Sequence, residues 1–170
     1  MHHNKRFAPR CIHAGQKPDP ATGAIMTPVY QTSTFVQESP GIIKEDYDYA
    51  RSANPTRKAL EQNLASLEGA RHGITFASGL ASLAACIHLL QSGDHVVLCD
   101  DVYGGTFRQL DKVFKQFGIA YSRADMTDLG AVDAAFTAKT KLCWIETPTN
   151  PLLKVIDIQA VAAIAKPKGA

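Results

Sequence analysis

Three short segments place polar or aromatic side chains directly after apolar runs that read as buried strands. They are residues 78–82, which open a helix, residues 100–106 around Tyr103, and residues 146–151 with Glu146 and Asn150. Parallel strands end at one edge of a sheet, where ligands bind. N–H groups at a helix start hold anions, and a tyrosine ring stacks on a planar ligand. Together the segments predict a ligand site at this edge.

Each segment taken alone also has an ordinary structural explanation. Ser78 and Gly79 can form a helix cap and a tight turn, and Tyr103 can be a surface residue in a glycine-rich turn. Glu146 can be a solvated carboxylate in a loop that two prolines stiffen. The residues alone leave these alternatives open.

A fourth candidate is the pair Tyr49 and Arg51, which precedes the first regular helix. In an extended backbone, residues two apart point the same way, so a hydroxyl and a guanidinium there could grip one phosphate. By itself this spacing is commonplace.

Other chemistries lack their sequence signatures. The chain has no glycine-rich dinucleotide motif, no P-loop and no hydrolase serine motif around Ser78 or Ser82. Its four cysteines form no CxxC pair, and its histidines lack metal-ligand spacing. We therefore expect no metal site.

The composition is that of an ordinary globular protein. Of the 170 residues, 45% are apolar and 20% charged, and the formal net charge of +2 is too weak to suggest a nucleic-acid partner. No apolar run is long enough for a membrane span, and the N-terminus lacks the apolar core of a signal peptide. We expect a cytoplasmic protein without nucleic-acid or membrane partners.

Apolar runs alternate with amphipathic helices from Asn54 onward, which predicts an α/β fold with a mostly parallel sheet and helices on both faces. The first third is rich in proline and has little periodicity, so we expect an extended arm that lies on something else. The expected strands are 73–77, 95–99, 119–122 and 141–146. One helix is expected to start near Pro55, and four others are expected at 80–90, 106–117, 129–136 and 157–165.

Taken together, the segments resemble the pyridoxal-phosphate (PLP) enzymes of cysteine and methionine metabolism, the cystathionine γ-synthase and γ-lyase family. The resemblance runs from about His13 to Ile158. It rests on residues 13–15, 28–35, 49–51, 54–57, 67–69, 77–79, 103–106 and 145–151.

The resemblance implies a cofactor, pyridoxal 5'-phosphate, and a role for each matched position. Tyr49 and Arg51 would reach the phosphate of a neighbouring subunit's cofactor, and Tyr103 would stack on the pyridine ring and act in catalysis. Ser78, Gly79 and Leu80 would hold the phosphate at the helix N-terminus, although the family commonly has Met where Leu80 stands. Glu146 and Asn150 would lie around the ring, with Asn150 on its phenolic oxygen side.

The resemblance also implies the architecture of a fold-type I, aspartate aminotransferase-like enzyme. Residues 1–54 would be an arm contacting a neighbouring subunit, and residues 55–170 an incomplete PLP-binding domain. The lysine that attaches the cofactor and the aspartate that partners its ring nitrogen are absent, because Lys141, Lys154, Lys166 and Lys168 do not match the lysine's setting. We expect the front portion of a homotetrameric enzyme, a dimer of dimers, inactive on its own.

The reaction that the resemblance favours is γ-replacement or γ-elimination on cystathionine or an O-activated homoserine. Asp48 and Arg108 match charged positions that would bind these amino-acid substrates, although both also suit a solvated surface. A methionine γ-lyase usually carries cysteine near Gly105, which disfavours that assignment. A cystathionine β-lyase or a methionine γ-lyase on the same scaffold stays an alternative, and so does a truncated, catalytically dead binding protein.

Overall fold

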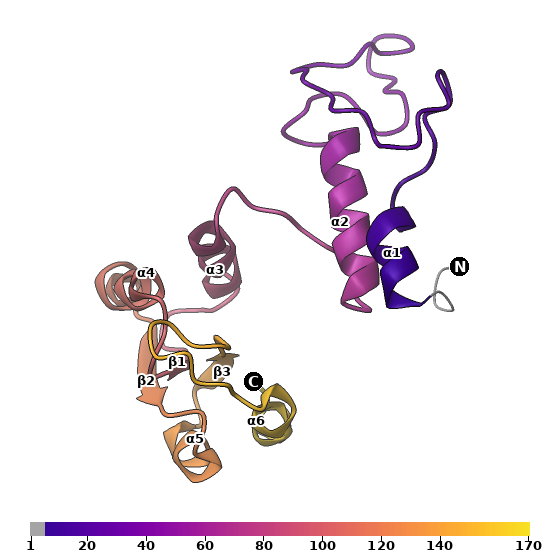
Figure 1. Cartoon of the computed structure of the whole chain (residues 1–170). Helices are drawn as coiled ribbons and strands as arrows, with labels where there is room; N and C mark the ends of the chain where they lie inside the picture. The colour runs from indigo at the N-terminus through magenta and orange to yellow at the C-terminus, as the bar shows by residue number, and fades with distance from the viewer. Residues whose placement is uncertain (1–5) are drawn as a thin grey trace. The chain divides into compact units, whose positions relative to one another are not determined.

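The computed structural model describes residues 6–170 and divides the chain into two compact units, which meet in the sequence at Thr75 and Phe76 (Figure 1). The first unit contains the proline-rich segment and one long helix, and the second contains the whole sheet.

The second unit is built on a three-stranded parallel sheet, which confirms the predicted fold class. Strands β1 (His95–Cys99), β2 (Ala120–Ala124) and β3 (Thr140–Trp144) lie in the order β2-β1-β3. All five residues of the central strand β1 are buried, as its continuous apolar run predicts.

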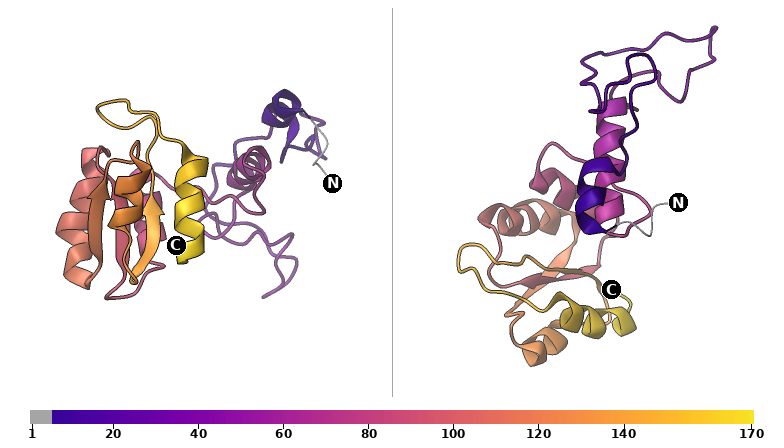
Figure 2. Two further views of the ribbon diagram at one scale, coloured as in Figure 1. Left: turned by 90° about the horizontal axis from the view of Figure 1, so that it is seen from below. Right: turned by 45° about the vertical axis from the view of Figure 1, so that its right-hand side comes forward.

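Helices cover both faces of this sheet (Figures 1 and 2). One face carries α3 (Gly79–Ile87) and α4 (Gly104–Arg108), and the other carries α5 (Leu129–Ala135) and α6 (Ile158–Ala165). The core between these layers is contributed by strand and helix alike. Its most buried side chains include Leu83, Ile87, Val96, Val97, Leu98, Val132 and Val161.

The helix predicted for 106–117 begins earlier and changes its winding. After α4 the chain continues as a π-helix, η1 (Gln109–Val113), and a 3-10 turn, η2 (Phe114–Phe117). Gly118 ends it with φ 81°, a left-handed conformation that glycine adopts without strain. A last 3-10 turn, η3 (Lys166–Lys168), follows α6.

The predicted strand 73–77 is wrong: this segment forms no ladder in the part of the chain that the structure describes. Both the N–H and the hydroxyl of Thr75 donate to Glu61 Oε1, at 3.0 Å each. A strand requires a neighbour to pair with, and here a side chain takes the place of the ladder.

The first unit consists of two packed helices and a long irregular segment. Helix α2 (Pro55–Leu67) begins as predicted, with the Asn54 side chain accepting from the N–H groups of Thr56 and Arg57. Helix α1 (Phe7–His13) was not predicted. The Asn63 amide of α2 joins the two helices by donating to the carbonyls of Arg10, Cys11 and Ala14.

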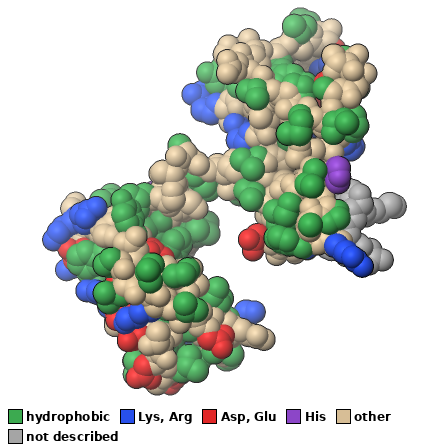
Figure 3. All heavy atoms as spheres, viewed as in Figure 1, with side chains coloured by type: hydrophobic (Ala, Val, Ile, Leu, Met, Phe, Trp, Pro, Cys, Tyr) green, Lys and Arg blue, Asp and Glu red, His purple; other side chains and the backbone are tan. Residues whose placement is uncertain are grey.

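Residues 16–54 are held by isolated bridges instead of a sheet, such as the one between Thr34 and Tyr49. Many apolar side chains of this segment are exposed, among them Ile25, Met26, Val29 and Val36. Figure 3 shows apolar atoms spread over the surface of this unit. Within residues 6–170, no helix combines the length and the apolar character that a membrane crossing requires.

Candidate functional site

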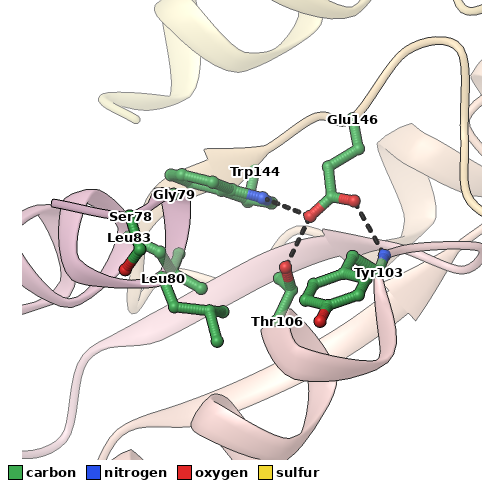
Figure 4. Close-up of a pocket in the computed structure, with 8 residues that line it drawn as sticks. All are labelled: Ser78, Gly79, Leu80, Leu83, Tyr103, Thr106, Trp144 and Glu146. Atoms are coloured by element: carbon green, nitrogen blue, oxygen red, sulfur yellow. Dashed lines mark hydrogen bonds between the residues drawn. The ribbon is translucent and has the colours of Figure 1, made fainter. Parts of the chain in front are cut away.

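A pocket of about 490 Å³ lies in the second unit, where the chain leaves β1 and β3 and enters α3 (Figure 4). Six of its eight lining residues come from three of the segments singled out in the sequence. The lining residues are Ser78, Gly79, Leu80, Leu83, Tyr103, Thr106, Trp144 and Glu146. The position matches the edge where open parallel sheets bind ligands.

The N-terminus of α3 forms one wall of the pocket. Ser78 is extended, and its hydroxyl accepts from the N–H of Ala81 at 3.2 Å. The N–H groups of Gly79 and Leu80 have no partner within the described residues, as expected at a helix start. A Cβ added at Gly79 would meet no atom within 4 Å, so a ligand has room to approach this backbone. These features suit an anionic group.

Tyr103 lies at the N-terminus of α4, and its side chain is half-exposed at the pocket. Its ring lies over Gly105, where an added Cβ would be 2.5 Å from Tyr103 Cε1 and 3.0 Å from Leu80 Cδ1. The absence of a side chain at residue 105 therefore lets the ring lie in this position. An accessible aromatic face so placed can stack on a planar ligand.

Glu146 joins the end of β3 to the start of α4 through three hydrogen bonds (Figure 4). Its Oε2 accepts from the backbone N–H of Tyr103 at 2.8 Å. Its Oε1 accepts from the Thr106 hydroxyl at 2.6 Å and from the Trp144 indole at 3.1 Å. Protein donors thus occupy both carboxylate oxygens, so the geometry favours an indirect role in which Glu146 fixes the segment carrying Tyr103.

Five predicted site residues thus line one pocket: Ser78, Gly79, Leu80, Tyr103 and Glu146. Asn150 and Arg108 belong to the same unit, but both are exposed and neither lines this pocket. The Arg108 guanidinium folds back on its own helix, with Nη1 3.1 Å from the place of a Cβ at Gly104. Asp48 is exposed in the first unit.

Tyr49 and Arg51 lie together in the first unit, with Arg51 Cζ 4.9 Å from the centroid of the Tyr49 ring. The premise of an extended backbone does not hold, because the N–H groups of Ser52 and Ala53 both donate to the Tyr49 carbonyl in a turn. The contact is a cation–π pair, and within the described residues no hydrogen bond of the Arg51 guanidinium competes with an anion.

Arg57 explains why the turn keeps its shape. Its guanidinium donates to the carbonyls of Ala50, Arg51 and Ser52 at 2.9, 3.2 and 3.0 Å. In the same motif, the Thr56 hydroxyl donates to Pro28 and accepts from the N–H of Tyr30. Residues 54–57 therefore hold the arm onto α2 in addition to starting the helix.

Sequence reasoning missed Thr106, Trp144 and Leu83 as pocket residues. Trp144 carried a usable signal, because it stands two residues before Glu146 and side chains two apart in a strand share a face. Thr106 occupies the first turn of α4, where its hydroxyl reaches the carboxylate beside Tyr103.

Neither a metal centre nor a nucleophilic thiolate at Cys99 or Cys143 finds support in residues 6–170. Three or more His, Cys, Asp or Glu side chains nowhere come together in an arrangement that would hold a metal ion. Burial raises the pKa of the Cys143 thiol to about 11 and also raises the pKa of Cys99. Both thiols are therefore protonated near neutral pH and unsuited to act as nucleophiles.

The chain is an α/β protein whose candidate pocket combines an open helix N-terminus with an accessible tyrosine ring. A family model described as "Cys/Met metabolism PLP-dependent enzyme" matches residues 8–170, and the chain belongs to this family. Membership implies pyridoxal phosphate as the cofactor, and the pocket offers it an anion-binding helix start and an aromatic face.

Curated relatives carry three different reaction names. The chain is 54% identical to a cystathionine β-lyase of Coxiella burnetii over 94% of its length. It is 50% identical to a cystathionine γ-lyase of Dictyostelium discoideum over 98%, and 48% identical to a cystathionine γ-synthase of Mycobacterium bovis over 96%. It covers 41%, 43% and 42% of these relatives respectively, about two fifths of their length.

A solved structure confirms the fold assignment. The crystal structure of metB from Corynebacterium glutamicum matches with a TM-score of 0.93 at 44% identity. The match covers 98% of this chain and 44% of that one. The resemblance to a fold-type I enzyme is thereby confirmed for the N-terminal part.

Proposed function

We propose that this chain is the N-terminal portion of a PLP-dependent transsulfuration enzyme, which acts by γ-replacement or γ-elimination on cystathionine or an O-activated homoserine. The observation that carries the proposal is the pocket in which the N-terminus of α3 and the ring of Tyr103 face one space. An anion-binding helix start beside an aromatic platform suits a phosphorylated ring.

The residues of this chain would bind and orient the cofactor. Gly79 and Leu80 would donate backbone N–H groups to its phosphate, with Ser78 beside them. Tyr49 and Arg51 add a hydroxyl and a guanidinium to the phosphate of a neighbouring subunit's cofactor, and charge-assisted bonds of this kind are strong. When bound, pyridoxal phosphate supplies an electron-withdrawing ring that stabilises negative charge on the α-carbon of an amino acid.

Other residues act on the ring and the substrate. Tyr103 would stack on the ring, and its hydroxyl would accept or steer the proton that leaves the substrate. Asn150 and Glu146 would lie around the cofactor ring, Asn150 on the side of its phenolic oxygen, and Glu146 would also fix the segment that carries Tyr103. Asp48 and Arg108 bind the charged groups of the amino-acid substrate. In the full-length protein, the attaching lysine and the aspartate at the ring nitrogen would come from residues outside this sequence.

The test is an assay of the full-length protein with two substrate mixtures. Cystathionine alone should yield cysteine and α-ketobutyrate if the γ-carbon bond is broken. An O-activated homoserine with cysteine should yield cystathionine if γ-replacement occurs. A full-length protein that binds pyridoxal phosphate but gives none of these products would refute the proposed reaction.

A second candidate reaction is β-elimination, which the 54% identity to a cystathionine β-lyase favours. The same assay separates it, since cleavage at the β-carbon releases homocysteine and pyruvate. Release of methanethiol from methionine would instead indicate a methionine γ-lyase. Absence of cofactor binding in the full-length protein would favour a catalytically dead binding protein.

We also propose that the arm, residues 1–54, contacts a neighbouring subunit in a cytoplasmic homotetramer. The exposed apolar side chains of the first unit, such as Ile25 and Val36, support an assembled state. Sedimentation of the full-length protein and of a version lacking the arm would test it.

A further inference from the structure

Asp101 is a buried carboxylate that the proposed chemistry does not use. It lies two residues after the end of β1, and 8% of its surface is exposed. It is the most buried carboxylate within the described residues. Burying a carboxylate is costly unless hydrogen bonds compensate for the lost hydration. The groups that donate to Asp101 therefore indicate its role.

These groups belong to the loop that connects β3 to α6 (Figure 1). Asp101 Oδ2 accepts from the Thr149 hydroxyl and from the backbone N–H of Leu152, the latter at 2.9 Å. These donors stand on either side of Asn150 and Pro151. One carboxylate oxygen therefore holds both ends of the short segment that carries Asn150.

Thr149 extends this hold through the rest of the loop. Its side chain is 1% exposed, and its hydroxyl oxygen accepts from the backbone N–H of Lys154 at 2.8 Å. Its own N–H donates to the Lys154 carbonyl at 2.9 Å. The Lys154 ammonium in turn pairs with Asp100 at 3.0 Å and Asp125 at 2.9 Å, at the ends of β1 and β2.

We propose that Asp101 is a positioning residue that holds the segment around Asn150 at the cofactor edge of the sheet. The inference rests on the proposed function, in which Asn150 contacts the cofactor ring. Asp101 itself need not touch the cofactor, because the hydrogen bonds of its carboxylate orient the loop. Its loss should therefore act on the cofactor only through Asn150.

The experiment is a double-mutant cycle in the full-length apoprotein, read by titration with pyridoxal phosphate. Asp101→Ala and Asn150→Ala should each weaken cofactor binding about tenfold, the scale of a lost hydrogen bond to a charged group. The double variant should be no weaker than the worse single variant within about twofold, because the two act as one unit. Additive effects, or unchanged binding in Asp101→Ala, would overturn the inference.

Further variants separate positioning from simple loss of stability. Asp101→Asn keeps an acceptor oxygen and should bind the cofactor within about threefold of wild type. Thr149→Val should resemble Asp101→Ala. The control is Asp128→Ala, which also removes a carboxylate that accepts backbone N–H groups, those of Gly130 and Ala131 at the start of α5, and should leave cofactor binding unchanged.

Hydrogen exchange in the apoprotein tests, without the cofactor, whether Asp101 orders the loop between β3 and α6. Asp101→Ala should speed exchange across residues 149–154 and leave α5 unaffected, and unchanged exchange there would overturn the inference. A wild-type protein that binds no pyridoxal phosphate would overturn the proposed function as well. If the wild-type protein binds pyridoxal phosphate normally and the effects of Asp101→Ala and Asn150→Ala are additive, only this inference would be overturned.

Discussion

The backbone N–H of Tyr103 donates to Oε2 of Glu146 at 2.8 Å, across 43 residues of sequence. This bond connects the segment after β1 to the segment after β3. Because Thr106 and Trp144 occupy the other oxygen, the carboxylate fixes the first turn of α4 and the end of β3 at once. The orientation of the Tyr103 ring thus depends on a residue that sequence reasoning placed beside the cofactor.

Glu146→Gln should destabilise the apoprotein by about 1–3 kcal/mol. The amide would present its NH₂ group to the donors at one of the two former carboxylate oxygens, and these donors would lose their acceptor. Urea unfolding of the full-length protein measures this. The control is Asp133→Asn, which removes an exposed ion pair to Lys168 and should cost less than about 0.5 kcal/mol. Equal stability of the two variants would mean that Glu146 does not support α4.

Tyr103→Phe should leave cofactor affinity near normal and reduce turnover by at least about tenfold, since the stacking face stays and the proton-handling hydroxyl is lost. Cofactor titration and steady-state assays of the full-length protein give the two numbers. Tyr121→Phe is the matched control, because its hydroxyl bonds to Asp111 away from the pocket. Wild-type turnover in Tyr103→Phe would leave the ring as a stacking platform alone.

The sheet and its helices could be predicted because local signals and tertiary packing agree there. The run around Val96 and Val97 is apolar on both faces, as a buried parallel strand requires. Asn54, Ser78, Asp128 and Asp157 each cap the helix that follows them. Strand 73–77 failed because a strand is defined by its partner, which a local pattern does not contain.

The pocket could be predicted in outline but not in its internal connections. Segments 78–82, 100–106 and 146–151 were marked by their position after apolar runs. The bonds of Glu146 to Tyr103 and of Asp101 to Thr149 cross more than 40 residues, since they span 43 and 48 positions. No periodicity encodes such pairs. Helix α1 was missed because its short sequence carries little apolar periodicity, and its hydrogen bonds to Asn63 of α2 join positions far apart in the sequence.

Gly105→Ala should destabilise the apoprotein by about 1–3 kcal/mol, because the new methyl would lie 2.5 Å from Tyr103 Cε1 and the ring must move. Gly79→Ala is the control, since its methyl would meet nothing within 4 Å and alanine favours a helix. Urea unfolding of both apoproteins tests the contrast. A Gly105→Ala variant as stable as Gly79→Ala would show that the ring adapts freely.

Arg51→Ala should lower cofactor affinity in the full-length protein, because a charge-assisted hydrogen bond to phosphate is worth about 1.5–3 kcal/mol. Since the proposed contact crosses a subunit interface, sedimentation should also show weaker assembly. Arg71→Ala is the control, because Arg71 is an exposed arginine of the same unit. An unchanged cofactor titration in Arg51→Ala would remove Arg51 from the proposed site.

Acid should weaken the ion pair between Lys154 and Asp125, which attaches the loop between β3 and α6 to the end of β2. The Lys154 ammonium and the Thr127 hydroxyl and N–H lower the pKa of Asp125 from 3.8 to about 2. A carboxyl whose pKa is lower in the folded state contributes stability that is full above the unfolded pKa and is lost as the pH falls through the folded one. Stability should therefore fall between about pH 4 and pH 2.

The measurement is urea unfolding of the full-length protein across this range. Asp125→Asn should be less stable than wild type at neutral pH and should lose less stability on acidification. Lys154→Met should flatten the curve in the same way, because the ammonium is the largest cause of the lowered pKa. If Asp125→Asn and wild type lost stability in parallel, the Lys154–Asp125 pair would not contribute to the acid sensitivity of the loop.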